Sequence, residues 1–196
     1  MHCFVYEAAD GSVTIGEPAS GAIAIMTGAG GMFPASQIER EIEKHVLGGK
    51  DAAVIRPFIE ALVSGGLTED AALDAIAAKD QPDGTAAIHN VPVSILAMDG
   101  TFRAAWVWDG AAVAVDMTKA RVIHMDAIRE VRNAELVARD ISFMRAVESG
   151  DASTQSSIGA EKQTLRDIPA TFDITTDVDT PEKLKAKWPA ELPARA

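Results

Sequence analysis

The clearest pattern along this chain is a helical period that runs without a break from Met117 to Glu148. No Gly or Pro occurs in this stretch, and apolar side chains recur every three or four positions. A helix of this length extends over roughly 48 Å, which exceeds the diameter of a compact body built from so few residues. We therefore expect another surface to cover it, from its own chain or from a neighbouring subunit. The apolar stripe predicted as an assembly interface consists of Ala120, Ile123, Ala127, Val131, Ala134, Ala138 and Ile141.

The residues after this segment predict a second, shorter helix that folds back on the first. Ser149-Gly150-Asp151 combines a helix stop with a new N-cap. The pattern then favours a helix over 152–166, with Pro169 as its end. Two helices joined so tightly form an antiparallel hairpin, and the remaining tail is expected to hold a short helix that begins near Thr180.

In the N-terminal part, short apolar runs alternate with turn signals. Asp10-Gly11 separates the runs 3–8 and 12–15, which is a strong signal for a β-hairpin because both residues tolerate positive φ. Strand character is also expected at 22–26 and again between 86 and 96. A second Asp-Gly pair, at Asp109-Gly110, predicts another hairpin within 105–115.

Between these runs the period changes to that of helices. Ser36 and Glu39 form a candidate capping box for a helix that ends before Gly48-Gly49. A second helix is expected over 51–64, where Pro57 should kink the helix or shift its start. A third helix is expected to begin at Thr68 and to stop before Asp80.

These elements together predict an α+β fold. A mixed domain with a β-hairpin, short helices and a small antiparallel sheet should cover residues 1–115, with a helical insertion at about 32–66. The long helical hairpin should cover 116–168, and a C-terminal tail with a short helix should cover 169–196.

Charge and composition narrow the range of partners. The net charge is −11, with a balance of −9 in residues 1–100 and −2 in residues 101–196. An acidic chain of this kind is not expected to bind nucleic acid or an anionic membrane. No apolar run approaches the length of a membrane span, and the first residues do not form a signal peptide. We therefore expect synthesis in the cytoplasm, and Cys3, the only cysteine, allows no intrachain disulfide.

The sequence contains no pattern that predicts catalysis. Its histidines lack metal-ligand spacing, and His124 is either a packed or interfacial side chain or, less readily, a metal ligand. The glycines at 28–31 and 48–49 do not form a phosphate loop. Trp106 and Trp108 share one face of a strand, which favours core packing over a carbohydrate-stacking platform. We therefore predict no catalytic residue, no cofactor and no metal.

Several segments of the chain resemble small proteins of tailed bacteriophages and prophages. The similarity extends over about 96–192, with a further segment at 68–80, whereas 31–66 is an insertion relative to that pattern. The blocks that carry it are Asp99-Gly-Thr-Phe-Arg-Ala-Ala-Trp, Asp116-Met-Thr-Lys-Ala-Arg-Val-Ile-His-Met-Asp-Ala-Ile-Arg, Lys162-Gln-Thr-Leu-Arg-Asp-Ile-Pro and Leu184-Lys-Ala-Lys-Trp-Pro.

The resemblance implies a non-enzymatic structural protein of the virion, made in the cytoplasm of the bacterial host. Such a subunit would belong to the tail, the tail tip or baseplate, or the attachment of a tail fibre. Its partners would be copies of itself and other tail proteins. The alternatives are an assembly chaperone that is absent from the mature particle, a capsid decoration protein or, with least support, a wall-degrading enzyme at a tail tip.

Overall fold

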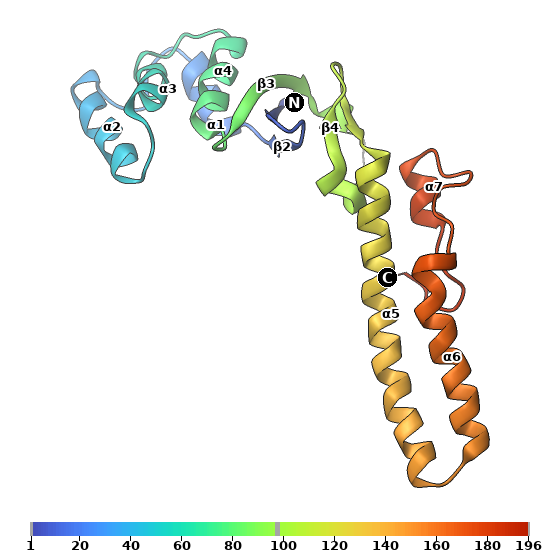
Figure 1. Ribbon diagram of the computed structural model, residues 1–196. Helices are drawn as coiled ribbons and strands as arrows, with labels where there is room; N and C mark the ends of the chain where they lie inside the picture. Colours follow the sequence, from blue (N-terminus) through green and yellow to red (C-terminus); the bar gives the residue numbers. More distant parts are fainter. Residues whose placement is uncertain (1, 97–98, 196) are drawn as a thin grey trace. The chain divides into compact units, whose positions relative to one another are not determined.

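The computed structural model describes residues 2–96 and 99–195. The fold is α+β and about 59% helical, with a small antiparallel sheet in the N-terminal part and a long helical hairpin in the C-terminal part (Figure 1). The predicted fold class is therefore confirmed. The chain forms two compact units, one from Met1–Met98 with Val107–Ala114, the other from Asp99–Trp106 with Val115–Ala196.

The sheet of the first unit has β1 (His2–Ala8) as its central strand. β2 (Val13–Gly16) pairs with one edge of β1 and β3 (Thr85–Pro92) with the other, and both pairings are antiparallel. Asp10 fixes the β1–β2 turn, because its carboxylate accepts hydrogen bonds from the backbone N–H and the hydroxyl of Ser12 at 2.9 and 2.6 Å. The predicted N-terminal hairpin is thus present.

Cys3 lies on the central strand and is fully buried, as are its neighbours Phe4 and Val5. Its Sγ lies 3.6 Å from the carbonyl oxygen of Val91 on β3. Burial, with a smaller contribution from the Glu17 carboxylate, raises the pKa of the Cys3 thiol. The thiol is therefore enclosed and protonated at neutral pH.

One face of β1 packs on the helices of the first unit. These are α1 (Ser20–Thr27), α2 (Ile38–Leu47), α3 (Ala52–Ser64) and α4 (Glu69–Asp80), with a 3-10 turn at Ala35–Gln37 before α2. Asp51 and Thr68 cap α3 and α4 through their side-chain oxygens. The core of this unit includes Phe4, Tyr6, Met26, Ile42, Ile55, Ile59, Leu73 and Ile76.

Three local predictions for this unit are wrong. Residues 22–26 are helical in α1 and do not form a strand, because a short run that is apolar at every position shows no period that separates the two. Ser36 lies inside a 3-10 turn, and α2 begins after Gln37 without a side-chain cap. Val93–Leu96 form a 3-10 turn, so β3 ends earlier than expected.

The second predicted hairpin is present as a two-stranded sheet of β4 (Trp106–Trp108) and β5 (Val113–Val115). Asp109 closes it by accepting hydrogen bonds from the backbone N–H groups of Ala111 and Ala112 at 2.8 and 2.7 Å. The indole of Trp108 stacks on the imidazole of His89, with ring centroids 4.2 Å apart. Trp108 therefore packs within its own chain.

The second unit is built on α5 (Met117–Glu148) and α6 (Ala152–Thr171), which lie side by side as an antiparallel pair (Figure 1). Asp116 caps α5 through hydrogen bonds from the N–H groups of Thr118 and Lys119. The connection between the helices uses Gly150 at φ 69°, a conformation that favours glycine. A short helix, α7 (Pro181–Ala186), follows.

The end of α6 differs from the prediction, because Pro169 does not terminate it. The helix continues to Thr171. Proline removes one backbone hydrogen bond here, but it lies in the last turn, next to Ile168, which is 4% exposed. Ile168 packs with Met125, Ile128 and Leu165 in the core of the unit.

The core of the second unit includes segments that were expected to lie outside the helical hairpin. Residues 99–106, expected in the N-terminal domain, form a 3-10 segment (Gly100–Ala105) whose Phe102 packs with Ala120, Val178 and Leu184. Asp99 forms an ion pair with Lys185, which is the main reason that its pKa is lowered. The tail beyond 169 is likewise part of this core, because Leu192 packs with the apolar residues of α5 and α6.

Candidate assembly interface

The long helix predicted from the sequence is present as one unbroken element of 32 residues. Its first half is covered by its own chain. Ala120, His124 and Ile128 are fully buried there, against residues of α6, of the tail and of the 99–106 segment. This half of α5 therefore already has its partner surface.

The second half of α5 meets α6 through apolar and charged side chains. Ala146 on α5 and Ile158 on α6 are buried, and ion pairs also join the two helices. Arg139 donates to Glu135 on its own helix and to Glu161 on α6, each at 2.9 Å. Lys162 of α6 forms an ion pair with Asp140. Ion pairs of this exposure contribute little, roughly 0–1 kcal/mol each. These ion pairs therefore add little to the stability of the distal half of the hairpin.

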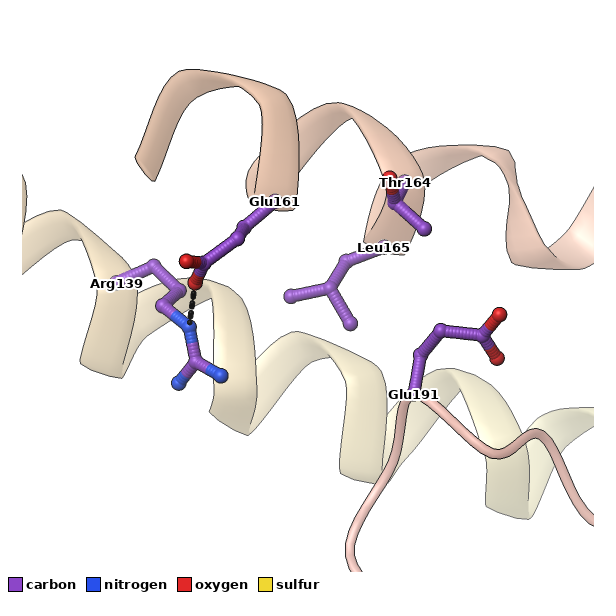
Figure 2. A pocket seen from close by; sticks show the side chains of 5 residues that line it. All are labelled: Arg139, Glu161, Thr164, Leu165 and Glu191. Atoms are coloured by element: carbon purple, nitrogen blue, oxygen red, sulfur yellow. Dashed lines mark hydrogen bonds and ion pairs between the residues drawn. The ribbon is translucent and has the colours of Figure 1, made fainter. Parts of the chain in front are cut away.

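A shallow crevice of about 190 Å³ lies beside this charged seam, lined by Arg139, Glu161, Thr164, Leu165 and Glu191. Figure 2 shows Glu161 turned toward Arg139, Leu165 pointing toward α5 and Glu191 reaching in from the tail. The Arg139 guanidinium is already compensated by two carboxylates. Beside this ion pair, the crevice is lined by the hydroxyl of Thr164, the apolar side chain of Leu165 and the carboxylate of Glu191.

On the side of α5 away from this seam, large apolar side chains are exposed to solvent. Val137 is 61% exposed, Ile141 54% and Met144 56%. Their spacing of four and three residues places them on one face, and the exposed Ala134 and Ala138 lie beside them. We call these five residues the outer face of α5. The distal half of α5 thus exposes large apolar side chains to solvent on the side away from α6.

The seven residues of the predicted stripe have different surroundings in the structure. Ala120 is buried and Ile123, Ala127 and Val131 are half-buried, so the first part of the stripe packs within the chain. Ala134, Ala138 and Ile141 are exposed and belong to the outer face. Val137 and Met144, which lie four and three residues from Ile141, are exposed on the same face but are not part of the predicted stripe.

No family model, curated protein or solved structure matches this chain. The role of the outer face is therefore inferred from its own geometry.

In residues 2–96 and 99–195, no helix is both long enough and apolar enough to cross a membrane. Within those same ranges, no group of three or more His, Cys, Asp or Glu side chains is placed to hold a metal ion.

His124, the histidine for which the sequence left two interpretations, is a packed side chain. Its Nε2 lies 2.7 Å from the carbonyl oxygen of Lys187, and its Nδ1 lies 3.3 Å from a guanidinium nitrogen of Arg195. The rings of Phe102 and Trp188 meet it edge-on. Both nitrogens are thus engaged by the chain, with Nε2–H as donor and Nδ1 as acceptor. This arrangement requires a neutral imidazole.

We expect His124 to make the second unit less stable in mild acid. Burial, and to a lesser extent the Arg195 charge, lowers the pKa of His124 below its ordinary value of 6.5. The unfolded chain binds a proton at a pH where the folded chain does not. The stabilisation is therefore complete above pH 6.5 and is lost as the pH falls below it.

An NMR titration of the His124 ring protons should give a midpoint below 6.5, and the free energy of unfolding should decrease between pH 7.5 and 5.5. In the His124→Gln variant, the free energy of unfolding should fall less over this pH range. The control variant His45→Gln, on α2, should show the same fall as the unchanged chain. A His124 midpoint at or above 6.5 would contradict the packed, neutral imidazole.

Proposed function

We propose that this chain is a non-enzymatic structural subunit that assembles through the outer face of α5. The observation that carries the proposal is the exposure of Val137, Ile141 and Met144, each by more than half, on one face of a 32-residue helix. Burying a side chain of this size contributes about 1.5–3 kcal/mol. Binding of a partner to the outer face would bury these side chains and release this free energy. The folded chain alone does not gain it, because the side chains stay exposed.

The assembly that we propose is the tail region of a bacteriophage virion, at the tail, the tail tip or baseplate, or the attachment of a fibre. The support for this part is the resemblance of the segments 99–106, 116–129, 162–169 and 184–189 to small phage proteins. These segments lie together in the second unit. Its core contains one residue from each of them: Phe102, Ala120, Leu165 and Leu184. A virion subunit needs rigid elements with apolar contact surfaces, which the outer face supplies.

Two measurements test this function. Mass spectrometry of purified particles should find the chain at a fixed copy number, and sedimentation velocity of the purified chain should show self-association at micromolar concentration. A chain that is monomeric at high micromolar concentration and missing from particles would overturn the proposal. Presence in producing cells but absence from particles would indicate an assembly chaperone instead, and a position on the head in a cryo-EM map would indicate capsid decoration.

A further inference from the structure

We infer that the outer face of α5 pairs with the same face of a second copy of this chain, with the two helices antiparallel. This inference rests on the proposed assembly function and adds the partner and its orientation. It follows from the position of unpaired charges around Val137 and Ile141.

Most charged side chains of the distal half of α5 have ion-pair partners in their own chain. Arg139 pairs with Glu135 and Glu161, and Asp140 pairs with Lys162. Arg145 and Glu148 in this half, and Glu130 just before it, are in contrast exposed and have no ion-pair partner among the residues that the structure describes. Of these, Glu130 and Arg145 carry opposite charges and flank the outer face at its two ends.

The spacing of Glu130 and Arg145 suits an antiparallel pair. They lie 15 residues apart, which corresponds to ~22 Å along the axis and to a rotation of only ~60° around it. Their midpoint lies between Val137 and Ala138. If a two-fold axis passes through this midpoint, Glu130 of each copy meets Arg145 of the other, and the symmetry forms this contact twice.

The same register also matches the sizes of the apolar side chains. It places Ala134 opposite Ile141 and Val137 opposite Ala138, so that in these pairs a large side chain faces a small one, whereas Met144 lies opposite Val131. Alternation of this kind lets two helices approach closely without voids. A parallel pair in register would instead place each residue against its own copy, with Arg145 against Arg145 and Glu130 against Glu130, which is unfavourable.

Charge reversal of the full-length chain tests the orientation, with the dissociation constant of the dimer measured by sedimentation equilibrium. In the antiparallel pair, Glu130→Arg and Arg145→Glu each replace two attractive contacts by two repulsive ones. Each single variant should raise the dissociation constant by about tenfold or more. The double variant exchanges the charges and should return the constant to within a few-fold of the original.

Two control variants change the net charge equally elsewhere on exposed surface. Glu43→Arg, on α2, and Arg166→Glu, on α6, should leave the dissociation constant unchanged. In a parallel pair the single variants would have little effect, since the contacts at 130 and 145 already join like charges. Self-association that survives both single variants, or a double variant weaker than either one, would overturn the antiparallel pairing and leave the assembly function standing. A chain that never self-associates would overturn both.

Discussion

Replacing Ile141 by glutamate is expected to turn a self-associating chain into a folded monomer. The side chain is 54% exposed, so the folded chain accommodates a charge there at little cost. Within an interface the same carboxylate is desolvated without a partner, which costs several kcal/mol. The dissociation constant should therefore rise by roughly a hundredfold or more. Sedimentation velocity measures this change, and circular dichroism should show unaltered helix content.

Val122→Glu provides the matched control for this variant. Val122 lies on the same helix and is 57% exposed, but it points ~100° away from Ile141 around the axis. Self-association of this variant should equal that of the unchanged chain. If the two variants behaved alike, the outer face of α5 would not be the contact surface.

Replacing Phe102 by alanine should destabilise the second unit by about 3–5 kcal/mol, the usual cost of truncating a buried phenylalanine. Phe102 is 2% exposed and packs with Ala120, Val178 and Leu184. Removing its ring also removes the edge contact with His124. Hydrogen exchange followed by mass spectrometry should show a loss of protection in α5, α6 and α7, with the peptides of β1 and β3 unchanged.

Phe143→Ala is the comparison for this second variant. Phe143 is only half-buried, with the ammonium group of Lys162 5.3 Å from its ring centroid. Its truncation removes less buried area and should cost clearly less. An equal loss of protection in β1 and β3 after Phe102→Ala would mean that residues 99–106 stabilise the first unit, contrary to the packing of Phe102.

The elements that the sequence predicted well are those with local signals. The helix from Met117 to Glu148 needed only an uninterrupted period, and its start was marked by the Asp116 cap. The turn at Gly150 and the hairpins at Asp10 and Asp109 depend on residues that are adjacent in the chain. Signals of this range do not require knowledge of tertiary contacts.

The sequence could not predict which side of α5 the rest of the chain covers, because that side contacts residues that are distant in sequence. His124 meets Lys187 and Arg195, which lie 63 and 71 positions away. Apolar periodicity alone was also an incomplete guide here, because both sides of the distal half of α5 carry apolar residues. Ala146 is buried and Leu136 packs with Leu165, whereas Ile141 faces water. The apolar pattern therefore does not decide which side is covered.

The enclosed position of Cys3 gives the protein a built-in reporter. The chain has one thiol, on the central strand of the sheet and without exposed area. A thiol-reactive dye can modify it only after β1 separates from its neighbours, so the labelling rate follows the opening of the first unit. A cysteine introduced on the surface of α5 would react at once and selectively, which allows site-specific labelling without removal of the natural residue.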